Sequence, residues 1–87
     1  MLRVDTIETA SAITLKLYGR LIGAWVPGLE GLWRSAAGRP AAGTIVVDVT
    51  DVTSIDRAGR YLLRLMEAKS VTLAGEGTGI RALLGDW

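Results

Sequence analysis

The sequence predicts a small α/β domain with a mixed, mostly parallel four-stranded sheet and about three helices. Strand-like apolar segments alternate with amphipathic helical segments, as in sheets whose strands are joined by crossover helices. The most apolar strand, residues 44–49, is rich in β-branched side chains and is predicted to be buried on both faces. The 87 residues are expected to form a single domain, 1–87, near the lower size for a self-sufficient core.

The first two strands are predicted from alternating side chains. Residues 1–9 alternate partially between apolar and polar side chains, and residues 13–18 alternate strictly, as in a half-buried strand. The two segments are close enough in the chain to form an antiparallel hairpin, with the first strand at an edge of the sheet. Gly19 is predicted to end the second strand.

The first helix is predicted over residues 24–37, with Pro27 in its first turn, where proline is tolerated. An apolar stripe at i, i+4, i+7 and i+8 is formed by Trp25, Leu29, Leu32 and Trp33. Because the chain has no phenylalanine, we expect both tryptophans to fill the core, and an aromatic patch for a partner is the alternative. Residues 36–43, rich in Gly and Ala, are predicted to form a loop.

The second helix is predicted to begin near Asp56, after an Asp- and Thr-rich loop at residues 50–55. The Asp56 side chain would accept hydrogen bonds from the free N–H groups of the first turn. Gly59, in that turn, is a poor helix former and is interpreted as a close-packing point. The core-facing positions at 3.6-residue spacing are expected to be Ala58, Leu62, Leu65, Met66 and Lys69.

The C-terminal part is predicted to add a fourth strand at residues 71–74, a glycine-rich loop at 75–79 and a last helical turn or two at 80–84. Right-handed crossovers would make the second, third and fourth strands parallel to one another. The first strand would then lie antiparallel to them, at the edge.

Composition excludes several classes of function. The chain has no cysteine and no histidine, which excludes disulfides, thiolate metal sites, and the commonest zinc ligand and general base. A net charge of +1 argues against nucleic-acid binding. No apolar run approaches the ~20 residues of a membrane span, and the acidic N-terminus does not fit a signal peptide. We therefore predict a cytoplasmic, non-enzymatic protein with no metal, no cofactor and no direct membrane insertion.

Residues 47–59, Val-Asp-Val-Thr-Asp-Val-Thr-Ser-Ile-Asp-Arg-Ala-Gly, resemble the signature of the STAS family, the domain shared by sulfate transporters and anti-sigma factor antagonists. The direct matches are Asp48, Val52, Ile55, Asp56 and Gly59. In the regulated antagonists, a partner kinase phosphorylates the serine that directly follows the aspartate. This chain has Arg57 at that position, and neighbouring Ala58 also lacks a hydroxyl. The resemblance therefore implies that the serine switch is absent from its usual place.

The resemblance implies a STAS-like fold over nearly the whole chain, with a shortened C-terminus, and a non-catalytic protein-interaction module. The prototype is a bacterial anti-sigma factor antagonist, which binds a kinase-type anti-sigma factor through the strand–loop–helix turn and so frees the sigma factor for transcription. The residues expected to contact such a partner are Thr53, Ser54, Asp56, Arg57, Ala58, Gly59 and Arg60. Many family members have a further strand and a longer final helix. The edge or face that a shortened C-terminus leaves uncovered is a natural place for homodimer formation.

Two alternative functions remain open. A small-ligand or nucleotide sensor would use loop 75–79, in which Gly75, Gly77, Thr78 and Gly79 would present backbone N–H groups to a phosphate. The loop lacks the spacing of a P-loop, and Thr78 is more simply a helix cap. The other alternative is a soluble structural subunit of a lipid-transport assembly, as for the STAS-like components of such transporters.

The carboxylates around the turn have two interpretations. Asp48, Asp51 and Asp56 suggest a catalytic or divalent-metal site by their residue type. A strand end and a helix cap explain them without further chemistry, and we favour that interpretation.

The basic and hydroxyl side chains near the turn also allow more than one role. Arg57, Arg60 and Arg64 form a basic stripe that is either a solvated helix face or a contact surface for an acidic partner. Loop hydroxyls usually cap backbone groups, so substitute phosphorylation is not favoured at Thr50, Thr53 or Ser54.

Overall fold

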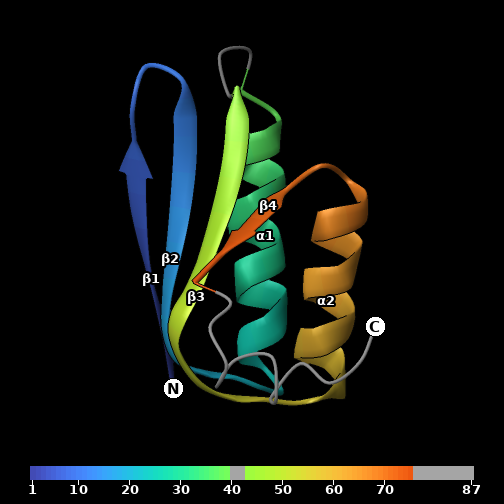
Figure 1. The fold of residues 1–87 in the computed structure, drawn as a ribbon. Helices are drawn as coiled ribbons and strands as arrows, with labels where there is room; N and C mark the ends of the chain where they lie inside the picture. Colours follow the sequence, from blue (N-terminus) through green and yellow to red (C-terminus); the bar gives the residue numbers. More distant parts are fainter. Residues whose placement is uncertain (40–42, 76–87) are drawn as a thin grey trace.

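The computed structural model describes residues 1–39 and 43–75 and shows two helices packed against a four-stranded sheet (Figure 1). The elements in chain order are β1 (Leu2–Glu8), β2 (Ala12–Leu21), α1 (Trp25–Ala37), β3 (Thr44–Ile55), α2 (Arg57–Ala68) and β4 (Thr72–Ala74). The helical turns predicted at residues 80–84 lie outside the described residues. The part of the chain that the structure describes is therefore α/β, with a mixed sheet and two helices.

The strands lie in the order β1-β2-β3-β4. Strand β1 pairs antiparallel with β2, whereas β2 with β3 and β3 with β4 pair in parallel. This confirms the predicted hairpin and the predicted parallel set. Since both parallel connections step across the sheet in the same direction, their helices cover the same face, as Figure 1 shows.

The core lies between this sheet face and the two helices. Alternate residues of β2 and β3 point into it, and Leu17, Val47 and Val49 are completely buried. No polar or charged side chain is buried in the described ranges. The buried set is Ile13, Leu15, Leu17, Leu21, Val26, Leu29, Trp33, Ala36, Ile45, Val47, Val49, Val52, Leu62, Leu63, Met66, Val71 and Leu73.

The prediction that residues 44–49 are buried on both faces is wrong for the described structure. Val46 and Asp48 lie on the face away from the helices and are only half-buried. Beside them on β2, Lys16 lies 5.4 Å from the centre of the Tyr18 ring and 3.7 Å from Asp51 Oδ2. β-Branched residues suit any pleated surface that is at least half-covered, so their presence does not require two covered faces.

The predicted core faces of both helices are rotated from the observed ones. Helix α1 buries Val26 and Ala36 beside Leu29 and Trp33, whereas Trp25 and Leu32 are 45% and 43% exposed. The sequence therefore predicted the burial of one of its two tryptophans correctly. An amphipathic stripe is more than 100° wide, and packing against the sheet selects its centre.

Helix α2 shows the same kind of rotation. It buries Gly59 and Leu63 together with the predicted Leu62 and Met66. Leu65 is half-buried, and the predicted core positions Ala58 and Lys69 are exposed. Position Lys69 lies past the last residue of the helix, where 3.6-residue spacing no longer decides burial.

The Asp- and Thr-rich segment 50–55, predicted as a loop, is the second half of β3. It pairs with the end of β2 through Leu21 opposite Ile55, with shifts of register before Tyr18 and after Gly19. Gly19 therefore does not end β2. It has φ +96°, and a Cβ there would lie 2.6 Å from the Met1 carbonyl oxygen, so glycine is needed for the close approach of the chain before β1.

Helix α2 ends at a left-handed residue that is not glycine. Ser70 has φ +72°, its N–H donates to the Glu67 carbonyl (3.1 Å), and the Val71 N–H donates to the Met66 carbonyl (3.0 Å). These two bonds make a Schellman motif, in which the left-handed position usually carries glycine. Serine at this position holds the turn into β4 at a conformational cost of about 1 kcal/mol.

Replacing Ser70 by glycine is expected to raise the free energy of unfolding by about 1 kcal/mol, because glycine adopts the left-handed region without this cost. Urea denaturation at pH 7 measures the change. The control is Ser35→Gly at an exposed position of helix α1, which should lower the free energy of unfolding by about 0.5 kcal/mol. A loss of stability in both variants would contradict the strain assigned to Ser70.

Candidate functional site

The candidate site lies at the carboxyl ends of the two central parallel strands. β2 ends at Leu21 and β3 ends at Ile55, and these two residues are register partners. The chain leaves β2 toward α1 and leaves β3 toward α2 at this same edge of the sheet (Figure 1). Ligands and partners of open α/β sheets commonly bind outside the carboxyl ends of the strands.

Asp56 joins the two turns through both oxygens of its carboxylate. Oδ1 accepts a hydrogen bond from the Gly59 N–H at 2.8 Å, which caps α2. Oδ2 accepts a second from the Gly23 N–H, also at 2.8 Å, in the turn between β2 and α1. The Asp56 N–H in turn donates to the Leu21 carbonyl at 3.3 Å. The predicted cap is thus confirmed, and the same side chain also fixes a turn 33 residues away.

The charge of Asp56 is stabilised by these donors. The N–H groups of Gly59 and Gly23 hold the pKa of the Asp56 carboxyl below its ordinary value. An ionised carboxylate at the first turn of a helix is also favoured by the positive end of the helix dipole. The ionised form is therefore the one that ties the turns together.

Gly59 lets the first turn of α2 lie directly on the end of β2. A Cβ on Gly59 would lie 2.5 Å from the Leu21 carbonyl oxygen and 2.9 Å from Leu21 Cγ. Both distances are too short for a real carbon atom, so any larger residue would push the helix away from the strand. This confirms the interpretation of Gly59 as a close-packing point.

The hydroxyls before the turn are used inside the structure. Thr53 Oγ1 donates to the Gly19 carbonyl at 3.1 Å, which adds a side-chain bond between β3 and β2. Thr50 Oγ1 donates to Asp48 Oδ1 at 2.6 Å, and this bond contributes most to lowering the pKa of Asp48. Ser54 is half-buried on β3. Thr50 and Thr53 therefore have structural roles, in agreement with the favoured interpretation of loop hydroxyls.

The side chains that face solvent at this turn come from the first turns of α2. Arg57 and Ala58 are exposed, and Tyr61, which sequence analysis did not single out, is 69% exposed. Arg60 is half-buried, and its Nε is enclosed without a hydrogen-bond partner in the described part of the chain. The exposed position of an aromatic ring one turn after Arg57 follows from helical spacing and could have been predicted.

The structure thus brings six of the seven predicted contact residues to one turn, with Thr53 pointing back to β2. Of these, Asp56 and Gly59 act inside the structure. Gly23, the residue that completes the turn, was missed, because nothing in the local sequence identifies it as the donor to a carboxylate so far along the chain.

Of the second predicted site, the glycine-rich loop at residues 75–79, the structure describes only Gly75. Gly75 has φ +76° and lies against Asp48, whose Oδ1 would be 2.8 Å from a Cβ placed on Gly75. A carboxylate so close disfavours an anion at Gly75 itself. Gly77, Thr78 and Gly79 lie outside the described residues.

Within residues 1–39 and 43–75, no three His, Cys, Asp or Glu side chains are grouped so that they could hold a metal ion. In the same residues no helix combines the length and the apolar character needed to cross a bilayer.

No protein-family model matches the chain, and no curated protein matches it at a significant level.

Acid should remove the contribution of Asp56 to stability. Folding lowers the pKa of the Asp56 carboxyl. The stabilisation by Asp56 is therefore fully present above the pKa of the unfolded chain, about 4, and is lost as pH falls through the lower pKa of the folded protein. We expect the difference in urea midpoint between native protein and Asp56→Ala to be constant from about pH 5 to 7 and to shrink below about pH 4. A difference that is unchanged at low pH would show that the charge of Asp56 does not hold the turns.

Gly59→Ala is expected to lower the free energy of unfolding by about 1–3 kcal/mol, because the added carbon would overlap Leu21. The matched control is Gly31→Ala in α1, where a Cβ meets no atom within 4 Å. That variant should gain about 1 kcal/mol from the higher helix propensity of alanine. Thermal or urea denaturation compares the two, and equal effects would contradict close packing at Gly59.

Proposed function

We propose that this chain is a STAS-like, non-catalytic protein-binding domain, and that its partner docks on the exposed first turns of α2. The partner proposed is a kinase-type anti-sigma factor with an acidic contact surface. The contact set comprises Arg57, Ala58, Arg60 and Tyr61. By resemblance, this binding would free a sigma factor in the bacterial cytoplasm.

The double hydrogen bonding of Asp56 is the observation that supports the proposal most directly. Both carboxylate oxygens bind backbone N–H groups, one from Gly59 and one from Gly23. This carboxylate therefore has a structural role, and it fixes the backbone that carries the exposed side chains beside it. Preorganised surfaces bind more tightly because less conformational entropy is lost on association.

The substitution at the switch position sets the mode of regulation. Arg57 is exposed and directly follows the cap residue. Phosphorylation of a serine there would add about −1.5 to −2 charges, whereas arginine adds a permanent positive charge. We therefore propose that partner binding is constitutive and that Arg57 selects a partner with an acidic surface.

Charge reversal at Arg57 tests the proposal. The tagged native protein and Arg57→Glu are used to capture partners from an extract of the cell that produces the chain, and captured proteins are identified by mass spectrometry. The affinity of the purified partner is then measured by calorimetry. We expect a kinase-type anti-sigma factor, and about a tenfold or greater loss of affinity in the variant.

Arg3→Glu serves as the control, because it makes the same charge change at an exposed side chain of strand β1. Its affinity for the partner should stay within about twofold of native. If the partner bound native protein and Arg57→Glu equally, or if only Arg3→Glu lost binding, the proposed surface would be wrong.

A further inference from the structure

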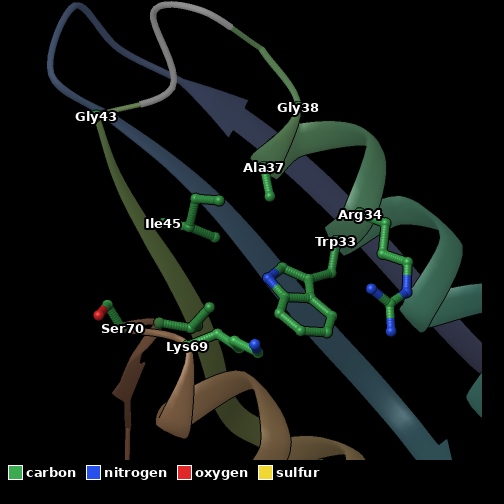
Figure 2. A pocket seen from close by; sticks show the side chains of 9 residues that line it. Trp33, Arg34, Ala37, Gly38, Gly43, Ile45, Lys69 and Ser70 are labelled. Atoms are coloured by element: carbon green, nitrogen blue, oxygen red, sulfur yellow. The ribbon is translucent and has the colours of Figure 1, made fainter.

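A cavity of about 480 Å³ opens at the other end of α2, away from the turn at Asp56. Because α2 contains 12 residues, its two ends are about 18 Å apart. The cavity is lined by the end of α1, the start of β3 and the turn from α2 into β4 (Figure 2). It is therefore separate from the proposed partner surface, and it is built only from residues that the structure describes.

The floor of this cavity is apolar, and the exposed side chains of Arg34, Lys69 and Ser70 surround it. Trp33, Ile45 and Val71 line it, and each belongs to the buried core, with 4%, 8% and 4% of its surface exposed. Figure 2 shows the methyl group of Ala37 turned toward the space between Ile45 and the Trp33 ring. A cavity of this size, with an aromatic wall, is in the range that binds small molecules.

The two cations at the cavity differ in their partners. Arg34 donates from Nε and Nη2 to Glu30 Oε2 at 3.0 and 2.8 Å, and its guanidinium lies 5.2 Å from the centre of the Trp33 ring. Lys69 has no carboxylate within 4.0 Å in the described ranges. In Figure 2 its side chain extends from the end of α2 toward Trp33. Lys69 is therefore the cation available to a ligand.

The helix ends limit how much negative charge the cavity can accept. Helix α1 ends at Ala37 and α2 ends at Ala68, so both helices turn their carbonyl ends toward this region. These ends carry partial negative charge, which disfavours anions in general and a polyanion such as a nucleotide most strongly. One ammonium group can offset a single carboxylate.

We propose that this cavity binds a small monocarboxylate with an aromatic or aliphatic body. The apolar body packs against Trp33, Ile45 and Val71, and the carboxylate pairs with the Lys69 ammonium. A buried apolar contact with one charge-assisted hydrogen bond gives both affinity and orientation.

Phenylacetate is the probe that tests this site. It is titrated into the ¹⁵N-labelled full chain, and NMR shifts are followed at the Trp33 indole N–H and at the amides of Lys69 and Val71. We expect saturable shifts at these groups. Phenylacetamide, which keeps the ring and removes the charge, and guanosine triphosphate, a polyanion, should each bind about tenfold more weakly or not at all.

Three variants separate the cavity from general charge effects. Lys69→Met should weaken phenylacetate binding about tenfold, and Ala37→Met, which places a longer side chain in the cavity, should abolish it. Lys16→Met makes the same charge change on the opposite face of the sheet and should bind like native protein. Circular dichroism confirms that each variant is folded.

Several results would overturn the proposal. These are the absence of saturable shifts up to about 10 mM phenylacetate, equal binding of phenylacetamide, or native-like binding by Lys69→Met. Shifts confined to residues outside the cavity would also overturn it. Because the partner surface is at the opposite end of α2, failure here leaves the partner-binding proposal unaffected, and the two are tested separately.

Discussion

The Asp56 carboxylate is the constraint on which the carboxyl-terminal edge of the two central strands depends. One oxygen caps α2, and the other holds the Gly23 turn that starts the path to α1. A single side chain thus sets the position of both helices relative to the strand ends. Because hydrogen bonds to an ionised acceptor are roughly twice as strong as neutral ones, the turn is held by charge as well as by packing.

Close packing at Gly59 and the bridge from Asp56 place the α2 surface by two independent means. The glycine lets the helix touch the end of β2 at Leu21, while the carboxylate prevents the turn from rotating away. The exposed Arg57 and Tyr61 are consequently presented on a rigid support. Rigid presentation would favour the proposed partner binding, and a permanent charge at Arg57 would suit the proposal that this binding is not switched by phosphorylation.

Local patterns in the sequence predicted the hairpin and the cap at Asp56, because each depends on neighbouring residues. The parallel strands were predicted from the handedness of crossover connections, and the packing role of Gly59 from the poor fit of glycine in a helix. The features of the fold and of the site that were not predicted depend on contacts between distant segments. Residues 50–55 have the composition of a loop, yet pairing with β2 makes them strand. The bond from Gly23 to Asp56 joins residues with no common local pattern. The core face of each helix is likewise chosen by the sheet, which is why Trp25 is exposed and Trp33 is buried.

Amide hydrogen exchange in Asp56→Asn tests the bridge most directly. Asparagine keeps an oxygen that can cap Gly59, but it places an N–H₂ group where the Gly23 N–H needs an acceptor. We expect the Gly23 amide to exchange faster in the variant, while the Gly59 amide keeps its protection. Unchanged exchange at Gly23 would contradict the bridge, because it would show that the carboxylate does not hold this turn.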